Sequence, residues 1–362
     1  MVAMNELNPA TAVTAIDPYP YYERLVAERP FHFDRSIGAW VAASGQAVEA
    51  VLDDTRMTVR PADAPTRTIL KHVARNTDGA EHSRLRGMLL SATEKMRGRD
   101  PNGMLDRCTA VLAGRREISD ARSAARVASE LPTLAVASLF EIDDEDCLSL
   151  VAPVVALVRS LATDASADDV ACGNEAMSIL QSFIPSKYLS DEISYETSAA
   201  NILSLFVQSG DATYGLVVNS LRILAGRNHF IDYVVNDPDF RTNFLCEVAR
   251  FESPVQNTRR YVAETSEVFG HSVCPGDEIV VLLAAANRDP DRYGRPHVFE
   301  PSRGKRVHYS FGRGVHACLG AEFAVAVAAR GLLQILAAGI DISEFAEAPF
   351  RNSKNLRIVE LP

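Results

Sequence analysis

The sequence is poor in several features that would place it in a common class of proteins. Its six cysteines are scattered and include no Cys-x-x-Cys pair, which argues against a disulfide framework and indicates reduced thiols. It has no excess of positive charge: the formal net charge is −10, which argues against a nucleic-acid-binding protein.

Long apolar runs and linkers are missing as well. Residues 1–20 contain neither an apolar run nor a basic stretch, and no later stretch is apolar for long enough to span a bilayer. We therefore expect a cytoplasmic protein without a membrane partner. No Ser/Gly-rich or Pro-rich linker divides the 362 residues, of which 47% are hydrophobic, so the sequence predicts a single domain over residues 1–362.

The most informative stretch present is residues 308–320, which reads His-Tyr-Ser-Phe-Gly-Arg-Gly-Val-His-Ala-Cys-Leu-Gly. An Ala/Val-rich run predicts a helix directly after it, from Ala321 to about Ala337. The unpaired N–H groups at the start of a helix favour the thiolate form of Cys318. A thiolate is a strong donor for iron. Three glycines remove side chains where a large flat ligand would approach: Gly312, Gly314 and Gly320.

This loop resembles the haem-ligand loop of the cytochrome P-450 superfamily, the haem-thiolate monooxygenases, which reads Phe-Gly-x-Gly-x-His-x-Cys-x-Gly. The resemblance implies a mainly α fold with small β-sheets, in which haem b (iron protoporphyrin IX) lies between a central distal helix and the helix after the cysteine loop. It makes Cys318 the iron ligand and O2 the co-substrate. Six positions match: Phe311, Gly312, Gly314, His316, Cys318 and Gly320.

A pair of basic residues lies on a helix that we expect to begin near Ala80. His82 and Arg86 are four residues apart, so they project from one face and suit a dianion such as the two haem propionates. A solvated basic face is the alternative. The resemblance implies that further residues hold the propionates: Arg260 in preference to Arg259, His316 and His308.

The resemblance also assigns an oxygen-binding segment to the apolar helix predicted over 201–224, which we expect the polar run 208–213 to interrupt. The family pattern is small-Gly-x-acid-Thr. Ser209, Gly210 and Thr213 match it, but Ala212 takes the acid position and Asp211 comes one residue early, which turns its side chain by about 100°.

In the family this threonine and acid deliver protons, so Thr213 and Asp211 are the catalytic candidates. A hydroxyl bonded to its own helix backbone is the alternative for Thr213. Ala212 leaves open a substrate-assisted proton route or a coupling reaction. The resemblance also implies four substrate-pocket residues: Ser209, Gly210, Val255 and Asn257.

Glu247 and Arg250 lie on one helical face, at a position that resembles the family's Glu-x-x-Arg pair. That pair is structural in the family and acts through a further arginine, here Arg303. Residues 284–290, which contain Asn287-Arg288-Asp289-Pro290, resemble another family signature.

Local patterns predict further elements and breaks. These are a helix over 21–28, a hairpin of strands 31–34 and 39–42, a helix over 45–52, a polar loop over 54–78 that carries Pro61 and Pro65, breaks at Gly173-Asn174 and Pro185, and short strands around a turn at 274–277.

The resemblance implies oxidation of a small organic substrate, in specialised metabolism. Electrons would come from a separate ferredoxin and its NAD(P)H-dependent reductase, because the chain has no flavin or iron–sulfur motif. Four basic residues near the loop would dock the ferredoxin, or form a merely solvated surface: Arg303, Lys305, Arg306 and Arg313. The alternatives are aryl coupling, desaturation or ring formation, and a haem sensor without turnover.

Overall fold

The computed structural model describes residues 7–59, 72–94, 100–162, 164–303 and 308–361. Most of them are helical, as the sequence predicts, and the strands form small sheets. Internal contacts divide the chain into two compact units. The sheet unit comprises Met1–Thr58, Ser119–Ala125 and Ala212–Pro362, and the helical unit comprises Val59–Ile118 and Arg126–Asp211.

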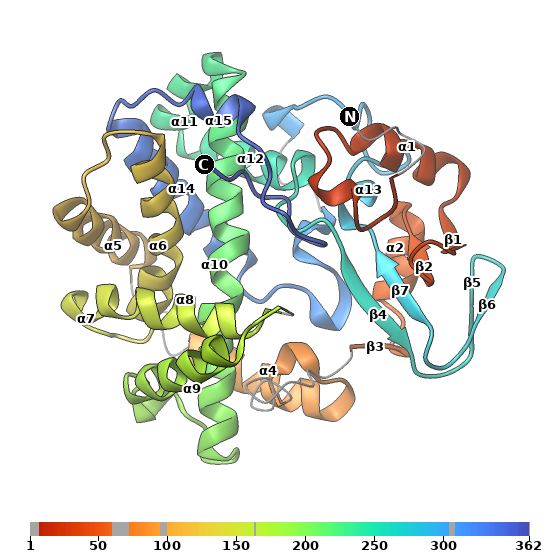
Figure 1. Cartoon of the computed structure of the whole chain (residues 1–362), viewed down its shortest axis with the longest axis horizontal. Coiled ribbons are helices and arrows are strands. Elements are labelled where there is room, and N and C mark those ends of the chain that lie inside the picture. Colours follow the sequence, from red (N-terminus) through yellow and green to blue (C-terminus); the bar gives the residue numbers. More distant parts are fainter. Residues whose placement is uncertain (1–6, 60–71, 95–99, 163, 304–307, 362) are drawn as a thin grey trace. The chain divides into compact units, whose positions relative to one another are not determined.

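The sheet unit begins with the predicted helix and hairpin (Figure 1). Its five-stranded sheet has the order β1-β2-β7-β4-β3; β2 and β7 are parallel, and the other pairs are antiparallel. The first elements are α1 (Tyr19–Glu28), β1 (Phe31–Asp34), β2 (Ala39–Ala42), α2 (Gly45–Leu52) and β3 (Met57–Thr58). The later strands are β4 (Thr258–Val262), β5 (Ser266–Val268), β6 (His271–Val273) and β7 (Glu278–Val281), with β5 and β6 paired as a separate hairpin.

Alternation along β7 gives this sheet a core on each face. Ile279 and Val281 pack in one cluster with Phe31, whereas Val280 packs in another with Val41. The predicted turn at 274–277 joins β6 to β7, with Gly276 at φ +92°. Two-sided burial holds the sheet in register and fixes which way each residue of β4 points.

The remaining helices of the sheet unit position the cysteine loop. They are α11 (Ile231–Asn236), α12 (Pro238–Phe251), α13 (Leu283–Ala286), α14 (Ala321–Ala337) and α15 (Glu344–Glu347). The helix predicted after the loop is α14, with the predicted bounds. The sequence prediction that no stretch is apolar for long enough to span a bilayer is wrong for one segment, because Gly314–Ala337 is long and apolar enough, by length and composition only. A single such segment also occurs in protein cores, and α14 buries Leu332 and Ile335 and packs against α12.

The helical unit is built from helices that follow β3 in the chain. Its helices are α4 (Gly79–Glu94), α5 (Pro101–Arg115), α7 (Asp144–Ser149), α8 (Val151–Ser160) and α9 (Ala167–Ser182), while α6 (Ala121–Leu139) and α10 (Tyr195–Ala225) run through both units. The expected break at Gly173-Asn174 is wrong, because both residues lie inside α9. A Cβ on Gly173 would lie 2.2 Å from the Ser160 side chain, so this glycine allows α8 and α9 to pack closely.

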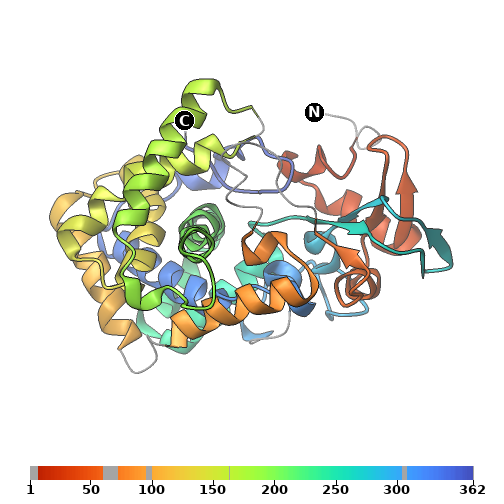
Figure 2. The same cartoon turned by 90° about the horizontal axis from the view of Figure 1, so that it is seen from below.

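The predicted interruption of the central helix is also wrong. The helix α10 is continuous over 31 residues, seen from the side in Figure 1 and end-on in Figure 2. Polar side chains of the 208–213 run bond to the helix's own backbone: Gln208 Nε2 donates to Ser204 O at 3.0 Å, and Ser209 Oγ donates to Phe206 O at 3.1 Å. These bonds satisfy the polar groups without opening the helix.

Candidate active site

The cysteine loop is a pair of 3₁₀ turns closed by its own backbone. Gly312 has φ +68° and Gly314 has φ +69°, a conformation that other residues rarely adopt. The N–H of Cys318 donates to Phe311 O at 2.8 Å. A Cβ on Gly314 would lie 2.5 Å from Leu52 O, so α2 approaches the loop closely. The glycines are therefore required by the loop itself, whatever it binds.

Asn287 fixes this loop from inside the sheet unit. Its Nδ2 donates to Ser310 Oγ at 2.8 Å, and its Oδ1 accepts from the N–H of Tyr309 at 2.8 Å. Ser310 Oγ donates in turn to Ala249 O at 2.6 Å on α12. The sequence singled out the Asn287–Pro290 stretch but gave it no role; its position beside the loop follows only from the tertiary structure.

An ion pair and a hydrogen bond attach the loop to α2 and the residue after it. Tyr309 OH donates to Glu49 Oε1 at 2.7 Å, and Arg313 Nε lies 2.6 Å from Asp53 Oδ2. Arg313 is thus paired, which reduces the positive charge that it offers to a partner. Lys305 and Arg306, two other residues of the predicted docking surface, lie outside the described residues, as do Pro61 and Pro65.

Cys318 is exposed and lies three residues before α14, whose N-cap is Gly320. The first N–H groups of a helix are unpaired and positive, so the helix start favours an anionic sulfur nearby. Exposure leaves the sulfur accessible to a ligand. This arrangement suits a thiolate that donates to a metal centre, as the sequence predicts.

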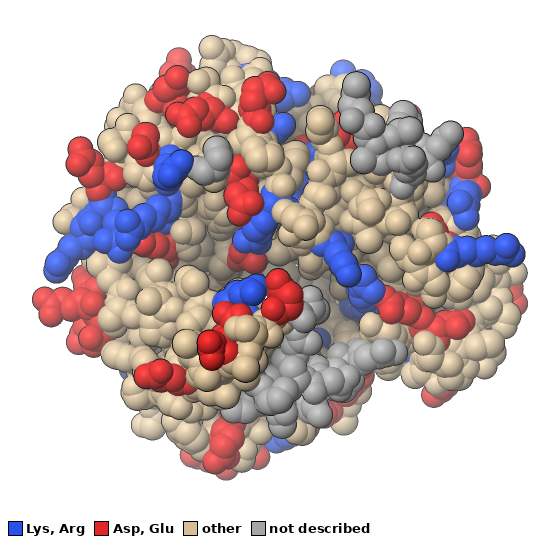
Figure 3. Space-filling model, viewed as in Figure 1, with Lys and Arg blue, Asp and Glu red and all other residues tan. Residues whose placement is uncertain are grey.

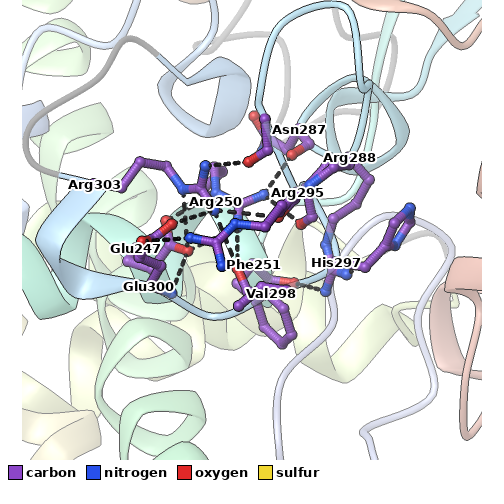
Figure 4. Close-up of polar contacts among 12 residues, drawn as sticks. Glu247, Arg250, Phe251, Asn287, Arg288, Arg295, His297, Val298, Glu300 and Arg303 are labelled. Atoms are coloured by element: carbon purple, nitrogen blue, oxygen red, sulfur yellow. Dashed lines mark hydrogen bonds and ion pairs between the residues drawn. The ribbon is translucent and has the colours of Figure 1, made fainter.

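Glu247, Arg250 and Arg303 lie together in the sheet unit (Figure 4). Arg250 Nη2 is 2.7 Å from Glu247 Oε1, and both side chains are almost fully buried. Arg303 Nε lies 3.5 Å from the same oxygen. Arg250 also donates to the backbone carbonyls of Asn287 and Pro296, so the ion pair is tied to the segment that holds the cysteine loop. Such a network is costly to break because each charge depends on the others.

His308 supplies a buried polar atom without a partner. Its Nδ1 makes no hydrogen bond to any described residue, and its ring packs against Phe311 with centroids 5.4 Å apart. Burial, together with the positive charge of Arg250, lowers the pKa of His308 to about 4, so the ring is neutral near pH 7. An unpartnered buried nitrogen beside the cysteine loop fits a ligand that brings its own polar group.

The strand β4 carries both Arg260, which the sequence prefers as a propionate ligand, and Arg259, the less favoured candidate. Arg260 is buried, whereas Arg259 is largely exposed and ion-paired with Glu278. Successive residues of a strand point to opposite faces. The inward position is the one that suits a buried anion, so the structure favours Arg260 over Arg259 on burial alone.

The helical unit holds His82 and Arg86 one turn apart on α4. His82 is buried, and its Nδ1 lies 2.7 Å from Ala74 O. A carbonyl only accepts, so Nδ1 carries a proton and the other nitrogen would donate to a carboxylate only in the imidazolium form. Asn201 of α10 also holds this turn, because its Oδ1 accepts from the N–H of Ala74 at 2.8 Å. Arg86 is half-buried and makes no hydrogen bond or ion pair with any described residue.

The distal candidates lie on α10 and on the chain entering β4. Thr213 is buried, and Asp211 is half-buried two residues earlier. Val255 packs against the core of the sheet unit. Asn257 is buried in a different place: its Nδ2 donates to Lys354 O at 2.9 Å, and it lines a cavity of about 260 Å³ together with Arg259. Asn257 thus lies with the exposed arginine of β4 and not with Arg260.

The sheet unit contains two more buried arginines: the sequence named Arg288 only as part of the 284–290 signature, without a role, and missed Arg357. Arg288 lies between the rings of Tyr19 and Phe251, 3.7 and 3.8 Å from their centroids. Arg357 pairs with Glu252 and donates to the carbonyls of residues 13, 15 and 16. Their partners are distant in the sequence, so no local pattern indicates these contacts.

These residues fit the predicted cofactor within each unit taken separately. The sheet unit offers an exposed thiol at a helix start, an unpartnered buried imidazole nitrogen and a buried arginine. The helical unit offers a buried histidine with a half-buried arginine one turn away. A soft anionic donor and several cationic or hydrogen-bonding groups are the set that an iron porphyrin with two propionates requires.

Comparisons with known proteins agree with this chemistry. The chain matches the family model described as Cytochrome P450 over residues 235–337. It is 25% identical over 347 residues to the biotin biosynthesis cytochrome P450 of Bacillus subtilis (strain 168), covering 85% of each protein. It is 26% identical over 357 residues to the cytochrome P450 monooxygenase PikC of Streptomyces venezuelae, covering 88% of this chain and 84% of PikC.

The fold is also that of solved structures. The structure of P450 RauA complexed with a biosynthetic intermediate of aurachin RE matches with a TM-score of 0.79, at 23% identity, over 99% of this chain and 97% of RauA. The mainly helical fold with small sheets is therefore confirmed.

Proposed function

Because this chain belongs to the cytochrome P450 family of haem b- and O2-dependent monooxygenases, we propose that it oxidises a small organic substrate in the specialised metabolism of a bacterium. The electrons would come from a ferredoxin and its NAD(P)H-dependent reductase, in the cytoplasm, with residues 1–362 acting as one haem domain. The observation that carries the proposal is the exposed Cys318 in a glycine loop at the start of α14.

The chain's own residues have distinct parts in this proposal. Bound haem would supply O2 activation, which a thiolate donor promotes. Cys318 would be the donor, and Gly312 and Gly320 would keep side chains away from the haem, with Phe311 beside it. His82, Arg86, Arg260, His308 and His316 would hold the propionates. Glu247, Arg250 and Arg303 stabilise the core that carries the loop.

The spectrum of the reduced, CO-bound protein tests this assignment. A red-shifted Soret band characteristic of thiolate ligation should appear, and Cys318→Ala or Cys318→His should abolish it. Cys274→Ala is the matched control, because Cys274 is exposed on the turn after β6 and should leave the band unchanged. A normal band in the Cys318 variants would overturn the proposal.

A second candidate is a coupling, desaturation or ring-forming oxidation. Ala212 at the usual acid position motivates it, because Asp211 is turned by about 100° on the helix from where a direct proton donor would stand. Thr213→Ala should uncouple O2 consumption from product in the monooxygenase, and Asp211→Asn should do so only if Asp211 relays protons. Product analysis with a surrogate ferredoxin separates hydroxylation from coupling, and NAD(P)H-driven turnover of any kind excludes a sensor.

A further inference from the structure

A groove on the helical unit combines an apolar floor with a pair of arginines that share one buried carboxylate. It has a volume of about 490 Å³ and is bounded by α6, α7, α8, α9 and the end of α5. Every residue that lines it belongs to the helical unit. None of these residues belongs to the proposed haem site, so the groove needs an explanation of its own.

The arginine pair is built around Glu130 of α6. Glu130 is buried; its Oε2 lies 2.9 Å from Arg116 Nε, and its Oε1 lies 3.0 Å from Arg126 Nε. Burial of the carboxylate fixes the two guanidinium groups, because a buried charge without a partner is costly. One carboxylate neutralises only one of the two cations, so the cluster keeps a net charge of about +1.

Both arginines keep N–H groups for a ligand. Arg126 contacts Glu130 through Nε, and its terminal nitrogens make no hydrogen bond to a described residue. Arg116 adds only a 3.4 Å contact from Nη1 to Arg115 O. A guanidinium carries five N–H donors in a planar fork that matches a carboxylate. In the view of Figure 3, basic side chains gather over α5 and α6.

The floor beside this pair is apolar. Val151, Ala152, Val155 and Ala156 form one stripe along α8, and Leu148 extends it from α7. Val155 is 62% exposed, so the stripe is not covered by other described residues. Arg159, the next residue of the stripe, is paired with Asp164 and Asp169, which give that end of the groove a net charge of about −1.

We propose that this groove binds a small amphipathic anion, a carboxylate with an aliphatic body. The carboxylate lies between Arg116 and Arg126, and the aliphatic body covers Val151 and Val155. The site is separate from the haem chemistry and does not rest on it. The groove offers positive charge at one end and an apolar stripe along its floor. A carboxylate with an aliphatic body matches both features, whereas an inorganic ion matches only the charge and a neutral hydrocarbon matches only the stripe.

Cys172 provides a reporter, because this exposed thiol of α9 lines the groove. The haem-loaded protein is treated with iodoacetamide, with imidazole present to occupy the haem, and alkylation of each cysteine is followed by peptide mass spectrometry. Octanoate should slow alkylation of Cys172 several-fold while leaving Cys274, exposed in the sheet unit, unaffected. Octanol should protect Cys172 much less.

Two variants and a matched control complete the test. Arg126→Ala keeps the Arg116–Glu130 ion pair and should weaken octanoate binding about tenfold. Val155→Asp, at an exposed position, should also weaken it, by placing like charge on the floor. Arg115→Ala removes an exposed arginine that does not line the groove and should change nothing. Absence of protection by octanoate, equal protection by octanol, or an unchanged affinity in Arg126→Ala would each overturn the proposal.

Discussion

The side-chain amide of Asn287 donates to the hydroxyl of Ser310 at 2.8 Å, and so joins the end of α13 to the loop that presents Cys318. The same amide group donates to Ser253 Oγ at 2.9 Å and accepts from the N–H of Tyr309. One buried side chain therefore holds the loop at Tyr309 and Ser310 and ties it to Ser253.

Replacing Asn287 with Ala should loosen this loop. The change leaves the buried N–H of Tyr309 without its acceptor and removes one hydrogen bond from each of the Ser253 and Ser310 hydroxyls, which should lower the free energy of unfolding by about 2–4 kcal/mol. Urea unfolding and the CO-bound spectrum would measure it, with part of the thiolate band lost. Asn257→Ala is the control: it removes one hydrogen bond, to Lys354 O, and should leave the band intact. An unchanged band in Asn287→Ala would contradict this account.

The Glu247–Arg250 ion pair should be far more important for stability than an exposed pair of similar geometry. Glu247→Gln leaves Arg250 buried without a counter-charge and should cost about 3–5 kcal/mol in urea unfolding. Asp53→Asn breaks the pair with Arg313, whose side chains are 42% and 41% exposed, and should cost about 1 kcal/mol or less. Equal losses in the two variants would refute the distinction.

The two arginines of β4 should differ in their effect on haem retention. Arg260→Ala removes a buried cation and should speed transfer of haem to apomyoglobin about tenfold or more. Arg259→Ala removes an exposed residue paired with Glu278 and should leave the transfer rate nearly unchanged. A larger effect of Arg259→Ala would show that the other face of the strand meets the cofactor.

His308 should make the protein less stable in mild acid. Burial first, and then the charge of Arg250, lowers its pKa from 6.5 to about 4 in the folded chain. Between these values the unfolded state binds a proton that the folded state does not. The contribution of His308 to the free energy of unfolding is therefore fully present above about pH 6.5. It falls, by roughly 2–3 kcal/mol, as the pH approaches 4.

His308→Gln removes the titrating group and should flatten the difference in unfolding free energy between pH 7.5 and pH 5, measured in urea. His271→Gln is the control, because His271 is exposed on β6. If the wild-type and His308→Gln proteins lose stability in parallel over this range, the ring is not the source of the acid sensitivity.

The sequence by itself determined the family chemistry and the local elements. The helices α2 and α14 and the first hairpin depend on contacts between residues close in the chain, so their periodicity, glycines and turn residues were enough to predict their bounds. Local signals gave wrong predictions where polar residues and a glycine indicated a break in a helix. In α10 they bond within the helix, and in α9 Gly173 serves the packing against Ser160.

Only the tertiary structure decided which residues of the site act together. Pairing of β4 with β7 turns Arg260 inward and Arg259 outward, and burial places Asn287 against the cysteine loop. Arg116 and Arg126 meet at Glu130 for the same reason. Apart from the i,i+4 pair of Arg126 and Glu130, such contacts join residues whose separation in the chain carries no periodic signal. They form because a buried charge or amide must find a partner wherever the fold brings one.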